Sequence, residues 1–202
     1  MNRKTKYIVV IGMLTALSTV LYYMLEVPVG AIVGMPHLKF DFSDIPALIG
    51  AVVLGPMAGV IIELLKCLLH LPKTTTFGIG DAINFFIGVA MILPFLGVSG
   101  MLIRRGVKKY QSYMVGYVVG TVCTVIVGMA SNYLLFPVYF SLAGFPVDNV
   151  AIMAAVQGSV LLNLIKTLLT VGPVVPFIER LEKAYEKTAS DLPGGRLSAV
   201  KN

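Results

Sequence analysis

Four polar side chains inside apolar segments are of types that could do chemistry. Glu63 and Lys66 lie three residues apart in one apolar run, and Asn163 and Lys166 repeat that spacing in another. Residues three apart share one face of a helix, so Glu63 can form an ion pair with Lys66. Asn163 cannot neutralise Lys166, so this ammonium must find acceptors elsewhere. In a membrane a charge costs at least about 2.5 kcal/mol on insertion scales, which makes Lys166 the sharper candidate for a binding site.

Two alternatives apply to these polar residues. Lys166 could reach the outer surface, or it could pair with Glu63 or Asp81. Asn132 precedes the stretch from Tyr133 to Tyr139 and carries both a donor and an acceptor. These groups suit the edge of a heteroaromatic ring, but a hydrogen bond to a neighbouring helix would use them equally well.

Two polar loops flank the apolar segments that carry these residues. The loop over 34–46 mixes aromatic, acidic and basic residues and could fold over the mouth of a pocket. Ser43 or Asp44 could instead only cap the helix that follows. The loop over 74–81 contains two glycines, which permit close approach of a ligand to the backbone.

Enzyme and metal motifs are missing from the sequence. It contains no GxxxxGK[ST], GxGxxG, HExxH or GxSxG pattern, and His37 and His70 have no partners at metal-ligand spacing. Cys67 and Cys123 stand alone in apolar stretches, where they are typical packing residues. We therefore expect a binding protein with no cofactor and no catalytic residues.

The composition shows which elements must position these residues. Of 202 residues, 57% are hydrophobic and 13% are charged, and the mean hydropathy is +0.87. Such a chain needs lipid as its solvent. The apolar runs, each bounded by helix-breaking residues, cover 7–25, 45–55, 56–71, 79–103, 112–140 and 151–178. The sequence thus predicts an all-α integral membrane protein with six transmembrane helices.

Glycine and other small residues predict how these helices connect and pack. Gly55-Pro56 is expected to form a tight turn between the second and third helices, rather than a kink in one long helix. Pairs of small residues four apart occur at Gly12/Ala16, Ala47/Ala51, Gly55/Gly59 and Gly116/Gly120. Such pairs let helix backbones approach closely, within one chain or against a partner protein.

The basic residues predict orientation rather than nucleic-acid binding. Twelve of the sixteen lie before the first helix, between the fourth and fifth, or after the sixth, instead of forming one continuous patch. Because basic residues near span ends remain cytoplasmic, both termini are expected inside the cell. We interpret 1–180 as one six-helix transmembrane domain and 181–202 as a cytoplasmic tail.

Several segments resemble those of a known family. They are Leu38-Lys39-Phe40-Asp41-Phe42-Ser43-Asp44-Ile45-Pro46, Gly55-Pro56-Met57-Ala58-Gly59, Glu63-Leu64-Leu65-Lys66, Gly80 with Asn84-Phe85, Asn132-Tyr133, Pro137-Val138-Tyr139 and Asn163-Leu164-Ile165-Lys166. Over nearly its whole length the chain resembles the S components of energy-coupling factor (ECF) vitamin transporters, in particular the riboflavin-specific members.

The resemblance implies the S-component fold and a set of partners. These are a membrane coupling subunit and two cytoplasmic ATPases in the plasma membrane of a prokaryote. The small-residue face of the first helix would contact the coupling subunit through Gly12 and Ala16. The family usually has alanine at both of these positions, so Gly12 is a mild departure.

The resemblance also implies a substrate and a site. Polar side chains of the fifth and sixth helices would contact riboflavin, and Asp81 stands where Glu or Gln is expected. The expected substrate-binding residues are Asn132, Lys166, Asn163, Asn84, Leu38, Phe40, Asp81 and Tyr139. An S component for pantothenate or a pyrimidine is the alternative within the family. A membrane enzyme or a proton-coupled secondary carrier using Glu63 and Lys66 is the alternative outside it.

Overall fold

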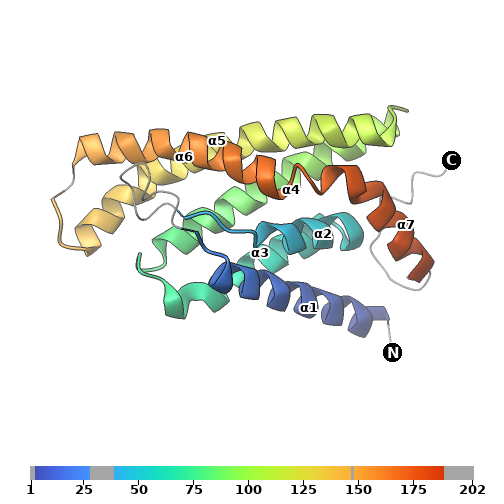
Figure 1. The fold of residues 1–202 in the computed structure, drawn as a ribbon, viewed down its shortest axis with the longest axis horizontal. Helices are drawn as coiled ribbons and strands as arrows, with labels where there is room; N and C mark the ends of the chain where they lie inside the picture. The colour runs from blue at the N-terminus through green and yellow to red at the C-terminus, as the bar shows by residue number, and fades with distance from the viewer. Residues whose placement is uncertain (1–2, 28–38, 147, 189–202) are drawn as a thin grey trace.

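The described parts of the chain are almost entirely helical. The computed structural model describes residues 3–27, 39–146 and 148–188 (Figure 1). The α-helices are α1 (Arg3–Met24), α2 (Asp44–Leu54), α3 (Pro56–His70), α4 (Ile79–Arg104), α5 (Lys109–Leu142), α6 (Asn149–Thr170) and α7 (Ile178–Thr188). Two short 3-10 helices, η2 (Leu71–Lys73) and η3 (Val175–Phe177), follow α3 and α6. The predicted all-α fold with six helices, α1 to α6, is confirmed, and α7 follows them.

The turn between α2 and α3 is formed by one residue. Gly55 has φ 106° and separates Leu54, which ends α2, from Pro56, which begins α3. Only glycine adopts this conformation readily, and proline suits the first turn of a helix. A Cβ on Gly59 would lie 2.5 Å from the Ala51 Cβ. The tight turn is therefore confirmed, and small residues bring the two helices together.

The long hairpin of α4 and α5 also depends on small residues. A Cβ on Gly116 would lie 2.6 Å from the Phe95 carbonyl oxygen, and one on Gly120 would lie 3.0 Å from the Met91 carbonyl oxygen. Both glycines thus let α5 approach the backbone of α4. Helices α1, α2 and α3 pack together as one half of the bundle, and α4, α5 and α6 form the other. In Figure 1, α1 lies along the lower edge and α6 near the upper edge, and α4 crosses the molecule obliquely between them.

The apolar core joins α1 to α5 with the segment after α6. Its centre contains the fully buried side chains of Phe95, Ile62 and Tyr113, and Val175 of η3 and Ile178 of α7 complete it. A smaller cluster of Phe136, Ile152 and Ala155 packs between α5 and α6.

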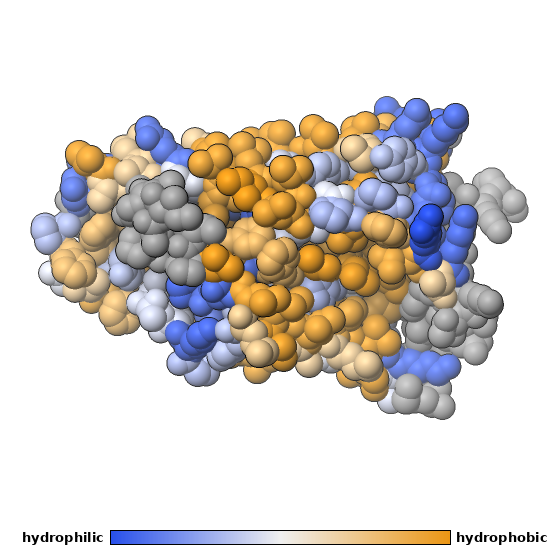
Figure 2. Space-filling view, viewed as in Figure 1, coloured by the Kyte–Doolittle hydropathy of each residue, from blue (hydrophilic) through white to orange (hydrophobic). Residues whose placement is uncertain are grey.

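The helix lengths and surface chemistry match a membrane. Four segments are long and apolar enough to cross a bilayer: Lys4–Met24, Ile79–Arg104, Lys109–Leu142 and Asn149–Ala184. At 1.5 Å per residue, α2 with 11 residues and α3 with 15 residues are too short to cross about 30 Å alone. Figure 2 shows apolar side chains in a band around the middle of one face, with polar side chains at both ends.

One end of the molecule gathers the basic segments. The start of α1, the connection between α4 and α5, and α7 all lie at the right in Figure 1. The described segments that carry the basic residues expected to be cytoplasmic therefore lie together, as the orientation hypothesis requires. The cytoplasmic placement itself stays a prediction.

Helix α7 begins before the predicted boundary at residue 180 and crosses it. Ile178 is buried in the core. The Tyr113 hydroxyl donates to Glu182 Oε1 at 2.6 Å, and Lys109 Nζ lies 3.1 Å from Glu182 Oε2. The first part of the predicted tail is thus a helix docked on α5, a contact that the polarity of this segment did not indicate.

Candidate functional site

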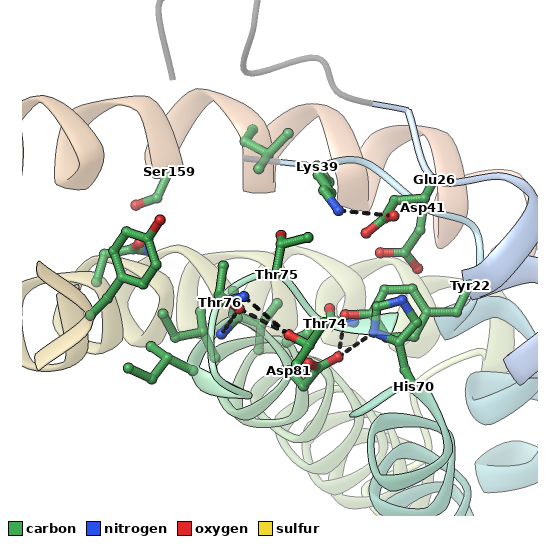
Figure 3. A pocket seen from close by; sticks show the side chains of 18 of the residues that line it. Tyr22, Glu26, Lys39, Asp41, His70, Thr74, Thr75, Thr76, Asp81 and Ser159 are labelled. Atoms are coloured by element: carbon green, nitrogen blue, oxygen red, sulfur yellow. Dashed lines mark hydrogen bonds and ion pairs between the residues drawn. The ribbon is translucent and has the colours of Figure 1, made fainter. Parts of the chain in front are cut away.

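A cavity lies between the two halves of the helix bundle, away from the basic end. The cavity is open to solvent, and the empty space inside it and at its mouth amounts to about 870 Å³. Residues from the end of α1, the segment before α2, the α3–α4 connection and the facing parts of α4, α5 and α6 line it (Figure 3). Both charged and apolar side chains contribute to its walls.

Most of the predicted substrate-binding residues lie at this cavity. Asn132, Lys166, Asn163, Asn84, Asp81 and Tyr139 line it. Phe40 does not, because its backbone pairs with Val27 and its ring packs edge-on against Phe42. Leu38 lies outside the described residues, although Lys39 and Asp41 bring the same segment to the wall. The fold thus brings together six predicted residues, which are up to 85 positions apart in the sequence.

Lys166 has three hydrogen-bonding or ionic partners at the cavity. Its Nζ lies 2.8 Å from Asn84 Oδ1, 2.9 Å from Asp44 Oδ2 and 3.1 Å from Asp41 Oδ2. The side chain is 6% exposed. The suggested alternatives for Lys166, the outer surface or a pair with Glu63 or Asp81, are wrong. Its carboxylate partners come from the segment before α2 and from the first residue of α2.

Lys66 is held in the same network, deeper in the protein. The side chains of Glu63 and Lys66 are completely buried, with Nζ 2.7 Å from Glu63 Oε2, so the predicted ion pair is confirmed. Lys66 also donates to Ser43 Oγ at 2.8 Å and to the Asp44 carboxylate. A Cβ on Gly88 would lie 2.5 Å from the Glu63 carboxyl carbon, so Gly88 makes room for this group.

Asp44 does not cap α2 as predicted. It is the first residue of the helix, and the flanking Ser43 makes no side-chain capping bond. The Asp44 carboxylate instead bridges Lys66 and Lys166. The reason is electrostatic, because leaving a buried ammonium group without an anionic partner costs more free energy than leaving a helix end without a side-chain cap.

A second polar cluster, of which only Asp81 was predicted from the sequence, adjoins the lysine network, since Lys66 Nζ lies 5.8 Å from the centre of the Tyr22 ring. Asp81 Oδ1 lies 2.6 Å from His70 Nδ1 and accepts a hydrogen bond from the Tyr22 hydroxyl at 3.1 Å. The rings of Tyr22 and His70 stack with centroids 3.8 Å apart. Figure 3 shows these side chains beside Thr74 and Thr76 at the same wall. His70 follows Lys66 by four residues, so the spacing of Glu63, Lys66 and His70 on one helix face could have indicated it.

Glycine brings the two asparagines of α5 and α6 together. Asn132 Nδ2 donates to the Gly128 carbonyl oxygen of its own helix at 2.8 Å. The amide nitrogen therefore does not make the suggested hydrogen bond to a neighbouring helix. Asn163 packs against the same residue, because a Cβ on Gly128 would lie 2.2 Å from Asn163 Nδ2. Only glycine leaves room for that amide at the cavity.

The side chains of the site are suited to hydrogen bonding rather than to metal coordination. Within 3–27, 39–146 and 148–188, no group of three or more His, Cys, Asp or Glu side chains is arranged to hold a metal ion. Amides, hydroxyls and ammonium groups beside apolar walls are typical of sites that orient a small organic molecule.

The outer face of α1 differs from the internal small-residue pairs. Gly12 and Ala16 are exposed, and a Cβ on Gly12 would meet no atom within 4 Å. Exposed apolar side chains surround them, with Met13 68% and Leu17 51% exposed. This face packs against nothing within the described chain.

The apolar helices and their polar cavity are those of a membrane-embedded binding protein. A model of the family described as "ECF transporter, substrate-specific component" matches residues 6–178. The chain therefore belongs to the family of ECF transporter substrate-specific components, which are transport subunits and not enzymes.

Individual relatives agree with this assignment. The chain is 32% identical over 170 residues to riboflavin transporter FmnP of Bacillus subtilis, covering 81% of this chain and 85% of that protein. It is 36% identical over 152 residues to riboflavin transporter RibU of Lactococcus lactis subsp. cremoris, covering 73% and 70%. A solved bacterial ECF transporter S component has a TM-score of 0.67 at 22% identity, over 89% of this chain and 99% of that one, and so shares the fold.

Proposed function

We propose that this chain captures riboflavin at the outer face of a prokaryotic plasma membrane, as the S component of an ECF transporter. The observation that carries the proposal is the convergence of Asn84, Asn132, Asn163 and Lys166 at one cavity. Relatives named riboflavin transporters, at 29–36% identity over most of the chain, support the choice of vitamin.

The chemistry of the walls suits a flavin. The isoalloxazine ring system is flat and aromatic, and Ile83, Ile87, Phe136, Tyr139 and Leu162 line the cavity with apolar surface. The pyrimidine edge and the ribityl hydroxyls need fixed donors and acceptors, which the amides and ammonium of the site provide. We assign substrate contacts to Asn132, Lys166, Asn163, Asn84, Asp81 and Tyr139.

Uptake requires partners that supply energy. We infer a membrane coupling subunit and two cytoplasmic ATPases, with the coupling subunit docked on the α1 face at Gly12 and Ala16. The packing of the glycines supports this docking site. Gly59 and Gly116 lie against helix backbones within the chain, whereas a Cβ on Gly12 would meet no atom within 4 Å. Both termini lie in the cytoplasm in this arrangement, together with the basic end of the molecule.

Binding can be measured with the purified protein in detergent. We expect riboflavin fluorescence to be quenched on binding, and unlabelled pantothenate and uracil not to compete. Lys166→Ala and Asn132→Ala should each weaken binding by tenfold or more, because each removes a buried polar contact. A wild-type protein that leaves flavin fluorescence unchanged, but binds pantothenate or uracil, would move the assignment to another vitamin or precursor within the family.

A further inference from the structure

The three protons of the Lys166 ammonium are all used within the protein. An ammonium group donates three hydrogen bonds, and three oxygens lie within 3.1 Å of Lys166 Nζ, from Asp41, Asp44 and Asn84. A substrate that hydrogen-bonds to Lys166 must therefore replace one of these oxygens. The identity of the replaced group determines how tightly the substrate binds.

Asp41 is the partner that can leave at least cost. Asn84 is on the long helix α4, and Asp44 is bound to Lys66 as well. Asp41 instead lies in the non-helical segment before α2, and only its Oδ2 contacts Lys166. Its Oδ1 accepts hydrogen bonds from the Ser43 backbone N–H at 2.9 Å and from the Ser43 hydroxyl. Because both oxygens belong to one carboxyl group, moving Oδ2 away from Lys166 also shifts Oδ1 and loosens the contacts of Asp41 with Ser43.

The position of Asp41 makes it a direct competitor of the substrate. Asp41 and Lys166 both line the cavity, whereas Asp44 does not. Asp41 is only 2% exposed, so its carboxylate is buried in the wall of the cavity (Figure 3). A carbonyl oxygen at the same place would accept the same ammonium proton.

We propose that Asp41 is an internal competitor that occupies the substrate's position on Lys166 and thereby sets the affinity. The inference rests on the proposed function. The group that displaces Asp41 is an acceptor oxygen, and the carbonyl-bearing pyrimidine edge of a flavin supplies one. Binding at Lys166 thus releases the segment containing Asp41, so that occupancy of the cavity changes the contacts of the loop before α2.

The charge balance indicates that the competitor can be removed. The network contains the carboxylates of Asp41, Asp44 and Glu63 against the two ammonium groups of Lys66 and Lys166. Asp41→Asn leaves two charges of each sign. The amide oxygen of the new side chain can still accept from Ser43, so we expect the variant to fold.

The test compares riboflavin dissociation constants by quenching of flavin fluorescence. Asp41→Asn should bind about tenfold more tightly than the wild-type protein, because a neutral amide competes less well for an ammonium. Asp41→Ser, which shortens the side chain, should change affinity in the same direction and serves if the first variant cannot be purified. Unchanged or weaker binding by these variants would overturn the inference.

Two further variants separate competition from a structural effect. Asp44→Asn also removes a carboxylate from Lys166 but vacates no place in the cavity, so it should lower the melting temperature without tightening binding. In a Lys166→Met background, Asp41→Asn should no longer raise the affinity, and tightening there would contradict action through Lys166. If the wild-type protein itself binds no riboflavin, the proposed function fails, and this inference fails with it.

Discussion

Glu63 shows how a buried charge is retained in a membrane helix. Its carboxylate is completely buried, contacts Lys66 and fits against Gly88. A buried ion pair contributes little net stability compared with apolar residues, but removal of one partner is costly to the other. Without Glu63, Lys66 would keep Asp44 as its carboxylate partner, and Asp44 is shared with Lys166. Glu63 is therefore expected to be needed for stability rather than for chemistry.

We predict that Glu63→Ala lowers the free energy of unfolding by about 3–5 kcal/mol, because Lys66 loses a charged partner. Glu63→Gln, which keeps the shape of the side chain, should cost less. Unfolding of the purified protein in detergent, followed by circular dichroism, measures both. If Glu63 were instead a proton relay of a secondary carrier, Glu63→Gln would abolish uptake while stability remained unchanged.

The residue-level predictions succeeded where partners are near in sequence. The Glu63–Lys66 pair followed from helical spacing alone. The partners of Lys166 could not be found in that way, because Asp41 and Asn84 are 125 and 82 residues away. The assignment of Asp44 as a cap failed for the same reason, since local sequence shows a helix start but not the two lysines that approach it. The resemblance to S components predicted that polar residues far apart in the sequence share one site, which helical spacing alone could not predict.

At the level of elements, glycines determine which helices approach closely. Gly116 faces the Phe95 carbonyl oxygen across the α4–α5 hairpin, whereas a Cβ added to Gly97 on α4 would meet no atom within 4 Å. We predict that Gly116→Ala lowers the free energy of unfolding by about 1–3 kcal/mol, because the helices must separate. Gly97→Ala is the matched control and should leave it unchanged. Equal melting temperatures for the two variants in detergent would contradict this packing.

The elements were predictable where breakers and hydropathy agree. Gly55-Pro56 indicated the turn between α2 and α3, and the apolar runs indicated six helices. Helix α7 was missed because Glu179, Arg180, Glu182 and Lys183 gave its sequence the character of a soluble tail. Its docking depends on Tyr113 and Lys109, which lie about 70 residues earlier. Polarity alone does not separate an exposed tail from a helix docked by specific hydrogen bonds.

For the whole molecule, capture and transport should be separable. The cavity lies between the two halves of the bundle and α1 reaches it through Tyr22 near its end, whereas Gly12 and Ala16 are on the outer face of α1. We predict that Gly12→Val combined with Ala16→Val leaves the riboflavin dissociation constant within about twofold but reduces uptake at least tenfold, because bulky side chains prevent close helix contact. Uptake of radiolabelled riboflavin by cells that contain the complete transporter measures this. Normal uptake would exclude this face as the docking site.

The central claim, that one chain captures one riboflavin molecule, is tested most directly by equilibrium dialysis of the wild-type protein in lipid nanodiscs. We predict saturable binding of labelled riboflavin at about one molecule per chain, displaced by unlabelled riboflavin and not by pantothenate. Absence of saturable riboflavin binding, in a preparation that retains its helical circular dichroism spectrum, would contradict the account.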